Sequence, residues 1–338
     1  MDESQRGDQR LSSLEGWLAE ILPGASAPVP ASSDASFRRY FRTECDGTSF
    51  ILMDAPPAQE DCRPFIAVAA WMEASSLPAP RVLQQDLEQG FLLLDDLGRQ
   101  TMLDALRQAE SEQQSAYYQS ALRLLVQLQA ADRGAPAELP PYTEALLDRE
   151  MDLFRDWYLL RLREVPWGPD EEGHWQSLKQ YLLEAIAPQP QGVVHRDYHS
   201  RNLMLRPDGQ LGMLDFQDAV RGSLCYDLIS LLRDCYWDLG AQAYSAHKAS
   251  YLQLAQSAGL LGPEVDLPQL SAWCDPMAVQ RHLKAAGIFA RLWLRDGKAG
   301  YLDDIPRTLG YIRAVCAQAQ APALRWLGQS LDQWQAAA

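Results

Sequence analysis

Few features of this sequence suit a protein that is secreted or inserted in a membrane. No stretch approaches the roughly 18 consecutive apolar residues that a membrane-spanning helix requires. The first ten residues, MDESQRGDQR, are polar and lack the apolar centre of a secretory signal peptide. We therefore expect a cytoplasmic protein without a membrane partner.

Cysteine is also sparse, with six residues in a chain of 338 and no CxxC pair among them. This number is far too small for a disulfide scaffold, and no spacing typical of a zinc site occurs. We expect reduced and mostly buried thiols. The six residues are Cys45, Cys62, Cys225, Cys235, Cys274 and Cys316.

Basic residues are outnumbered, with 30 Lys and Arg against 45 Asp and Glu, which gives a formal net charge of −15. A protein that wraps nucleic acid needs a net basic face, so we expect no nucleic-acid partner. The acidic surplus does not exclude a nucleotide, because a metal ion, backbone N–H groups and one or two arginines can hold its phosphates locally.

Residues 1–97 have the pattern of a small, strand-rich region. Leucines recur at helical spacing near the start, and later short apolar runs are separated by turn residues such as Asp46-Gly47. The expected elements are a helix over 11–22, strands over 37–41 and 49–53, a helix over 62–74, and a hairpin of 82–83 with 91–94.

Residues 98–338 are mainly helical by their periodicity, with one interruption between 192 and 215. There, Gly192-Val193-Val194 forms a short apolar run, and 203–206 pairs with 211–214 across Pro207-Asp208-Gly209. The fold class is therefore α+β. We predict a small β-rich N-lobe over 1–97, a hinge near 95–98, and a large helical C-lobe over 98–338.

The interruption carries the chemically most informative segment, VVHRDYHSRNLML at 193–205 followed by LGMLDFQDAV at 211–220. It has the pattern H-x-D-x(4)-N, with an Asp-Phe pair eighteen residues after the first aspartate. Phosphoryl transfer needs one carboxylate to accept the proton of the attacking hydroxyl, and a carboxylate and an amide oxygen to hold Mg²⁺ on the phosphates. We assign Asp197 as the base and Asn202 and Asp215 as the metal ligands.

A chance match on a solvated loop is the alternative, because short motifs recur by accident. The hairpin between the motif and Asp215, and the correct distance between them, argue against it. A zinc site built from His195 and His199, which are four residues apart, is a second alternative. No third ligand lies nearby at helical spacing, and the segment does not have the pattern of a helix.

The motif resembles the aminoglycoside phosphotransferase and small-molecule kinase branch of the protein-kinase-like fold, and the resemblance covers nearly the whole chain. It implies a bilobal enzyme that uses ATP and Mg²⁺, with a nucleotide-binding N-lobe and a catalytic, substrate-binding C-lobe. It also implies that His195 is structural and that Asp227 hydrogen-bonds the loop of the motif. A simple charge at the start of a helix is the alternative for Asp227.

Two further residues of the loop are candidates for the catalytic site. Arg201 lies four residues beyond Asp197, as in the HRDLAARN loop of tyrosine kinases, and His199 lies two beyond it. Either residue would contact the γ-phosphate or brace the substrate hydroxyl.

The nucleotide side departs from the family's pattern. In place of a glycine-rich loop the chain has ASSDASFRRYFR at 31–42, where Ser32, Ser33 and Ser36 offer donors to phosphates. The lysine expected on the third strand is replaced by Met53. A cation must come from elsewhere, and Arg38, Arg39 and Arg63 are the candidates, with Glu60 as a weaker candidate for an acidic partner.

The segment GFLLLDDLG at 90–98 resembles the strand and hinge that cradle adenine in this family. Backbone groups from Asp95 through Asp96 to Leu97 would contact the base. Adjacent strand residues point to opposite faces, so at most one of Arg38 and Arg39 would face the phosphates.

Within the family, SSDASFRRYFR, LMDAPP and GIFARLWLRDGKAGYLDDIPR resemble bacterial anomeric sugar kinases that phosphorylate N-acetylmuramate and N-acetylglucosamine at C1 in peptidoglycan recycling. The expected partners are then ATP and a small amino sugar, and a monomer is compatible with the sequence. Arg291, Arg295 and Lys298 are candidates for binding a sugar carboxylate, with Trp293 or Trp237 as a stacking face.

Three alternatives stay open. The charged residues near 291–298 would equally suit a solvated helix. The net charge of −15 and the ten tryptophans would suit an aminoglycoside- or choline-type kinase acting on a cationic alcohol. Met53 would suit a catalytically inactive binding protein, against which the intact set of Asp197, Asn202 and Asp215 argues.

Overall fold

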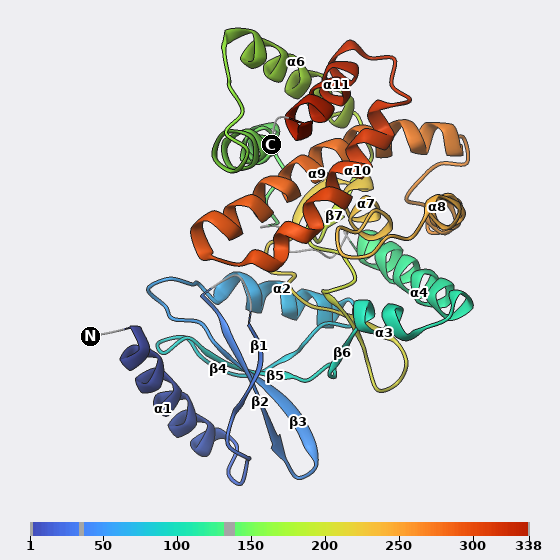
Figure 1. Ribbon diagram of the computed structural model, residues 1–338. Coiled ribbons are helices and arrows are strands. Elements are labelled where there is room, and N and C mark those ends of the chain that lie inside the picture. The colour runs from blue at the N-terminus through green and yellow to red at the C-terminus, as the bar shows by residue number, and fades with distance from the viewer. Residues whose placement is uncertain (1–2, 34–36, 132–138, 337–338) are drawn as a thin grey trace. The chain divides into compact units, whose positions relative to one another are not determined.

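The computed structural model of the protein describes residues 3–33, 37–131 and 139–336, and the chain divides into two compact units (Figure 1). Unit 1 comprises Met1–Gln100 and Met204–Gln217, and unit 2 comprises Thr101–Leu203 and Asp218–Ala338. Unit 1 is small and rich in strands, whereas unit 2 is larger and mainly helical. The predicted α+β fold class is therefore confirmed.

The described part of unit 1 contains a five-stranded antiparallel sheet of order β1-β2-β3-β5-β4. Two tight turns shape it. Asp46 and Gly47 both have positive φ, 50° and 76°, as a two-residue hairpin turn requires. Gly90 has a φ of 74°, and a Cβ there would lie 1.9 Å from the carbonyl oxygen of Ala55. The strands are β1 Val29–Ser33, β2 Arg39–Cys45, β3 Thr48–Asp54, β4 Val82–Asp86 and β5 Phe91–Asp95.

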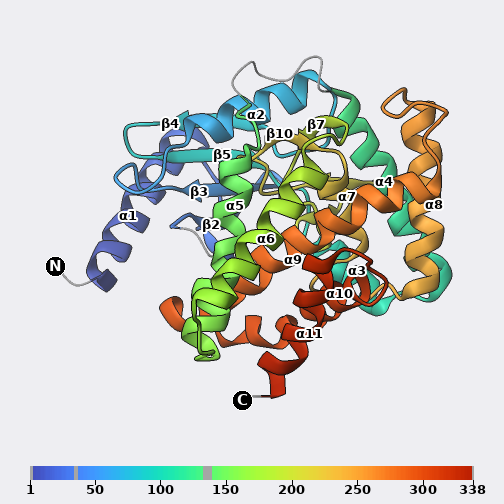
Figure 2. The same cartoon turned by 90° about the horizontal axis from the view of Figure 1, so that it is seen from above.

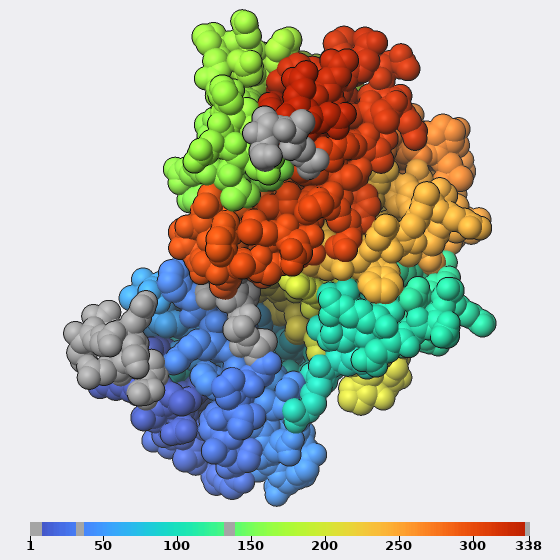
Figure 3. All heavy atoms as spheres, viewed as in Figure 1, coloured from blue at the N-terminus to red at the C-terminus, as the bar shows by residue number. Residues whose placement is uncertain are grey.

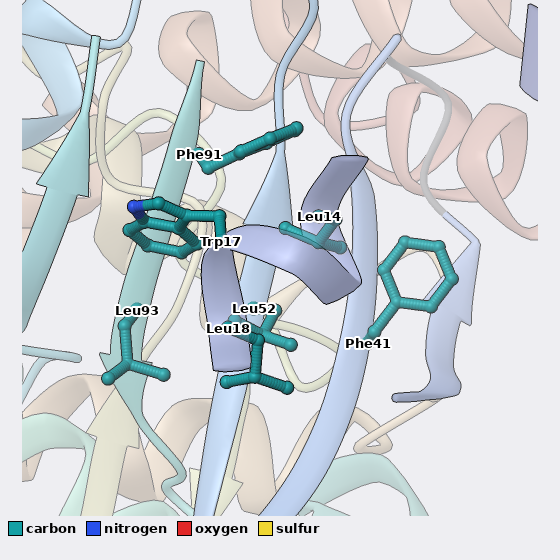
Figure 4. Packing of buried hydrophobic residues seen from close by; sticks show 7 residues of the cluster. All are labelled: Leu14, Trp17, Leu18, Phe41, Leu52, Phe91 and Leu93. Atoms are coloured by element: carbon teal, nitrogen blue, oxygen red, sulfur yellow. The ribbon is translucent and has the colours of Figure 1, made fainter. Parts of the chain in front are cut away.

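Helix α1 (Glu3–Ile21) covers one face of this sheet (Figure 4). Leu14, Trp17 and Leu18 are buried against Phe41, Leu52, Phe91 and Leu93 of the strands. Spacings of three and four residues place the three helical side chains on one stripe, which explains why the predicted amphipathic helix packs here.

An ion network fastens the same helix to the sheet. The fully buried carboxylate of Asp54 accepts hydrogen bonds from Nε of Arg10 on α1 and from Nε of Arg39 on β2, each at 2.9 Å. A buried carboxylate is strongly destabilising unless it is paired, so the two arginines satisfy Asp54.

Helix α2 (Arg63–Ala74) and the hairpin of β8 (Leu203–Leu205) and β9 (Leu211–Met213) complete unit 1. The ring of Phe216, which follows the hairpin, lies 4.8 Å from that of Phe65 on α2. The short strand β6 (Gln100–Thr101) is the third strand of the β8–β9 sheet.

Unit 2 is organised around the long helix α9, which contacts α5, α6, α7 and α10 (Figure 2). Two short strands, β7 (Gln191–Val194) and β10 (Val220–Ser223), pair antiparallel beside these helices. The α-helices are α3 Met102–Gln108, α4 Ser111–Ala130, α5 Glu144–Leu153, α6 Pro169–Ile186, α7 Cys225–Leu232, α8 Ala241–Ser257, α9 Leu267–Asp296, α10 Ile305–Cys316 and α11 Pro322–Ala336. The described residues also contain a π-helical segment η2 (Phe154–Leu162) and a 3₁₀ segment η3 (Ala299–Asp304).

Strands β1, β6 and β10 were not predicted from the sequence, and β2 differs in its bounds. Strand β2 begins and ends later than the predicted 37–41, and Phe37 is 62% exposed. Strand β1 was not predicted because Pro30 suggests a break, yet proline is tolerated on an edge strand. Strand β10 contains Gly222, where a Cβ would lie only 3.0 Å from Cβ of Tyr142, so close packing requires the glycine there.

The predicted lobe boundary at 97/98 lies three residues before the boundary at 100/101, and residues 204–217 belong to unit 1 rather than to the helical unit. Which unit binds the nucleotide stays a prediction. All six cysteines are free thiols, and all except Cys45 are buried. None of the helices in the described residues is long and apolar enough to span a bilayer.

We predict that Leu14→Ala lowers the free energy of unfolding by about 2–5 kcal/mol, because it opens a cavity between α1 and the sheet. Denaturant unfolding measures this difference. Glu15→Ala, on the exposed side of the same helix, should change it by less than about 0.5 kcal/mol. Equal effects of the two substitutions would show that α1 does not contribute to the core.

Candidate active site

The residues of the H-x-D-x(4)-N motif form a loop, 195–202, that follows β7. The backbone folds into consecutive turns, in which His199 N donates to Asp197 O at 3.0 Å and Asn202 N donates to His199 O at 2.9 Å. The amide of Asn202 also donates through Nδ2 to Asp197 O at 3.0 Å. The loop therefore holds the side chain of Asn202 against the backbone of Asp197.

Asp227 on α7 holds the beginning of this loop. Its fully buried carboxylate accepts hydrogen bonds from the backbone N–H of His195 at 2.6 Å and of Arg196 at 3.0 Å. Burial raises the pKa of Asp227 to about 7, and it outweighs the two N–H donors, which act in the opposite direction. Arg196 has a φ of 76°, a conformation that a non-glycine residue keeps only when its surroundings enforce it.

Asp234 holds the middle of the loop in the same way. Its buried carboxylate accepts from Ser200 N at 2.9 Å and from Tyr236 N at 2.8 Å. Asp234 was not predicted from the sequence. Its only local signal is its position two residues after the mainly apolar run LISLL.

A third buried carboxylate, that of Glu150 on α5, binds the guanidinium of Arg196, the residue before Asp197. One of its oxygens accepts from Arg196 at 2.6 Å and lies 3.1 Å from the ammonium of Lys284 on α9. Its other oxygen accepts from the hydroxyl of Tyr142, and Lys284 donates to the hydroxyl of Tyr226 at 3.0 Å. Glu150 and Lys284 lie far from the motif in sequence and were not predicted.

Asp197 itself is partly accessible, and the charges around it favour its ionised form. Burial acts to raise its pKa, but Lys284, His199, His195 and Arg196 together lower it below the ordinary value. The carboxylate is therefore ionised at neutral pH, as a general base must be.

The two histidines of the loop are both buried. His195 lies edge-on to Tyr198, with ring centroids 5.7 Å apart, which suits the structural role that the resemblance implies. Burial lowers the pKa of His199, so it is neutral at pH 7, and its ring lies edge-on to Tyr236 at 5.0 Å. A neutral imidazole is less suited to binding phosphate than the cation of Arg201.

Arg201 is exposed and lies against two aromatic rings. Its guanidinium carbon is 3.9 Å from the ring centroid of Tyr236 and 5.6 Å from that of Tyr301. These contacts belong entirely to unit 2, as does Asp197.

Asp215 belongs to unit 1 and follows β9. It has a φ of 63° and accepts a hydrogen bond from Nε2 of Gln217 at 2.6 Å. A carboxylate and an amide oxygen, with phosphate oxygens as further ligands, are a donor set that fits Mg²⁺. Because Nδ2 of Asn202 is bound to Asp197 O, its Oδ1 is the atom of this amide suited to a metal. The assignment of Asn202 and Asp215 as metal ligands stays a prediction.

The described residues contain no group of three His, Cys, Asp or Glu side chains arranged to hold a metal ion. The predicted Mg²⁺ ligands are of a different kind, since they combine one carboxylate with one amide and leave the remaining positions to phosphate.

Unit 1 places the candidate arginines in three different environments. Arg38 lies 3.0 Å from Glu60, and only 10% of its side chain is exposed. Arg39 is bound to Asp54 on the face covered by α1. Arg63 is 79% exposed and pairs with Asp61 at 2.9 Å. Arg38 is therefore the candidate with the cation–carboxylate pairing expected at a phosphate site.

Met53 is fully buried in β3, between Tyr40 and Leu92 of the neighbouring strands. The third-strand position thus carries no cation. Of the serines predicted to contact phosphate, Ser33 ends β1, where its backbone pairs with Arg39, while the side chains of Ser32 and Ser33 and the whole of Ser36 lie outside the described residues.

The predicted hinge is held by the side chain of Asp96. This carboxylate accepts from Arg42 at 2.6 Å, from Ser49 at 2.6 Å and from Gly98 N at 2.9 Å. Asp95 N already donates to Arg81 O at 3.2 Å. Among the described residues no hydrogen bond of the Leu97 backbone is found, so the N–H and C=O of Leu97 best suit the edge of a base.

The predicted sugar-binding residues lie where α9 ends, in the orange segment exposed in Figure 3. Arg295 binds Asp296 through two hydrogen bonds of 2.7 and 2.8 Å. Arg291 is half-buried, and its pKa is lowered by burial and then by Arg295. Trp293 is 37% exposed. Trp237 lies in a different segment, where its carbonyl is 3.5 Å from the hydroxyl of Tyr311.

Comparison with known proteins decides the family. The profile of the phosphotransferase enzyme family matches residues 28–261. The chain belongs to this family. It is 43% identical over 335 residues to the N-acetylmuramate/N-acetylglucosamine kinase of Pseudomonas aeruginosa, covering 96% of both chains. It is 40% identical over 312 residues to the protein of the same name from Neisseria meningitidis serogroup B, covering 91% of both.

The fold is shared with solved aminoglycoside phosphotransferases. The ADP-bound structure of aminoglycoside phosphotransferase APH(2'')-Ib superposes with a TM-score of 0.59 at 13% identity, covering 89% of this chain and 97% of the other. The predicted kinase-like fold, the family and the enzyme class are therefore confirmed, and the protein is a phosphotransferase that acts on a hydroxyl group. The roles of its individual residues stay predictions.

We predict that Asp227→Asn disorders the 195–202 loop, because the new amide presents a donor to one of the two backbone N–H groups. An unsatisfied buried group costs about 1–3 kcal/mol of folding free energy. Hydrogen exchange should show faster exchange of the His195 and Arg196 amides, together with a loss of activity. Asp332→Asn, at an exposed aspartate of α11, is the control and should change neither. Unchanged protection of both amides in Asp227→Asn would contradict the bracing role.

Proposed function

We propose that the protein is an ATP-dependent sugar kinase that transfers the γ-phosphoryl group to the anomeric C1 hydroxyl of N-acetylmuramate, N-acetylglucosamine or both. The observation that carries this proposal is the identity of 40–43% to the two relatives with that name, over at least 91% of each chain. The alternative, an aminoglycoside- or choline-type kinase, is supported only by the acidic, tryptophan-rich composition, which is weaker support than this sequence identity.

The carboxylate of Asp197 is a base that is compatible with an anomeric acceptor. Its surroundings lower its pKa, which makes the carboxylate a weak base. An anomeric hydroxyl is more acidic than an ordinary alcohol, so a weak base matches it better in proton transfer. Asp197 would orient the hydroxyl and accept its proton as the bond to phosphorus forms.

The remaining residues of the chain would hold the phosphates and the base. Mg²⁺, when bound by Asn202 and Asp215, would neutralise the charge of the phosphates. Arg38, positioned by Glu60, would supply the cation that Met53 cannot. The backbone of Leu97 would contact the adenine edge.

The product would be a sugar 1-phosphate, which suits activation by a nucleotidyl transferase. We propose that the reaction belongs to the recycling of peptidoglycan sugars, which the names of the two relatives support. The partners are then ATP and a small amino sugar, and cytoplasmic localisation follows from the use of ATP.

We predict that Asp197→Asn lowers kcat by about 10²–10⁴ while ATP binding persists, because general-base assistance typically contributes this much. The assay is a substrate panel with ³¹P detection, which distinguishes a C1 phosphate from an ordinary ester. The methyl glycosides, blocked at C1, are the matched control substrates and should not react. Phosphorylation of a methyl glycoside, or a preference for choline or an aminoglycoside, would contradict the proposal.

We predict that Arg38→Ala raises the KM for ATP by about ten- to a hundred-fold, the effect of losing a charge-assisted hydrogen bond to phosphate. Arg63→Ala, which removes an exposed arginine of the same unit, should leave the KM near that of the wild type. Arg39→Ala should lower stability instead, because it removes one partner of Asp54. If Arg63→Ala alone raised the KM, the assignment of Arg38 would be wrong.

A further inference from the structure

Arg201 is a cation held by aromatic rings rather than by a carboxylate. Its guanidinium lies over Tyr236 at 3.9 Å and faces Tyr301 at 5.6 Å. Among the described residues it makes no ion pair and no hydrogen bond. The carboxylate of Asp304 lies within electrostatic range but pairs with Arg307 at 3.4 Å. No described residue of unit 2 therefore forms an ion pair that neutralises Arg201.

The two tyrosines are themselves fixed. Tyr236 donates its backbone N–H to Asp234, the residue that also holds Ser200 of the 195–202 loop. Tyr301 stacks on Phe289 of α9, with centroids 5.5 Å apart, and Phe289 also contacts Tyr236 at 6.0 Å. The position of the guanidinium is thus tied to the loop that carries Asp197.

Stacking of this kind leaves the hydrogen-bonding edge of arginine available. The five N–H donors of a guanidinium lie in its plane. The guanidinium carbon of Arg201 lies 3.9 Å from the ring centroid of Tyr236, a distance that fits face-to-face stacking on this ring. An edge of this kind matches a carboxylate through two parallel hydrogen bonds. The arrangement therefore suits an anion that binds at the edge of the Arg201 guanidinium. Arg201 lies four residues after the proposed base, Asp197.

The two acceptor sugars of the proposed function differ in one group relevant here, since N-acetylmuramate carries a lactyl carboxylate and N-acetylglucosamine does not. We propose that Arg201, held by Tyr236 and Tyr301, binds this carboxylate and so determines the preference between the two sugars. The inference rests on the proposed function. The aromatic rings stabilise the cation when no carboxylate is present, which explains how a sugar without one can still be accepted.

The structure favours Arg201 over the arginines at the end of α9. Arg295 already directs two donors at Asp296, at 2.7 and 2.8 Å. Arg291 is half-buried beside a second cation, Arg295. A γ-phosphate is the other anion available to Arg201, but every contact that holds Arg201 lies in unit 2 together with Asp197, which would contact the acceptor.

The test compares kcat/KM for the two sugars, and the KM for ATP, in Arg201→Gln and in Arg123→Gln. Arg123 is an exposed arginine of α4 that donates a hydrogen bond to Ser120 at 3.0 Å, so it is the matched control. Arg201→Gln should lower kcat/KM for N-acetylmuramate about ten- to a hundred-fold more than for N-acetylglucosamine, with the KM for ATP unchanged. Arg123→Gln should change none of these values.

A binding measurement removes the dependence on turnover. By calorimetry, the methyl glycoside of N-acetylmuramate should bind Arg201→Gln about ten- to a hundred-fold more weakly than the wild type, while that of N-acetylglucosamine binds equally well. Equal losses for both sugars with a raised KM for ATP would overturn the inference in favour of a phosphate contact. A selective loss in Arg295→Gln instead would also overturn it. If the wild type phosphorylates neither sugar, the proposed function fails as well, whereas an unchanged sugar preference in an active Arg201→Gln overturns the inference alone.

Discussion

The carboxylate of Asp227 accepts hydrogen bonds from two consecutive backbone amides, and the geometry of the candidate site depends on this contact. It fixes the backbone where β7 ends, in a conformation that Arg196 would otherwise avoid. Asp234 accepts a hydrogen bond from one further backbone amide of the loop, that of Ser200. Because these backbone N–H groups are hydrogen-bonded within the protein, the side chain of Asp197 extends from a rigid backbone rather than from a solvated loop.

The buried charges around the loop position its residues more than they contribute to the folding free energy. Glu150 is buried with two cations, Arg196 and Lys284, and the ionised Asp197 balances the second of them. Buried ion pairs contribute little net folding free energy because desolvation offsets their attraction. Removing one member, however, leaves an uncompensated buried charge. The cluster therefore constrains which arrangement of α5, α9 and the loop is allowed.

The sequence was most informative where the chemistry is local. Asp197 and Asn202 share one short motif, and the helix and turn patterns of unit 1 are set by residues a few positions apart. Glu150 and Lys284 were not predictable in this way, because they meet Arg196 only after α5 and α9 pack together. Strand β10 was missed for a similar reason, since Gly222 packs against the side chain of Tyr142, which is distant in sequence.

Met53 has a practical consequence for chemical probes of this protein. A nucleotide analogue that carries an amine-directed electrophile would react with a lysine on the third strand, the residue expected there in this family. Here that position presents a thioether that is fully buried and cannot be acylated. Covalent labelling would need a different nucleophile, and Cys62, the thiol just before α2, is buried and has a pKa raised by its burial. The protein should therefore resist such reagents while still binding the nucleotide that carries them.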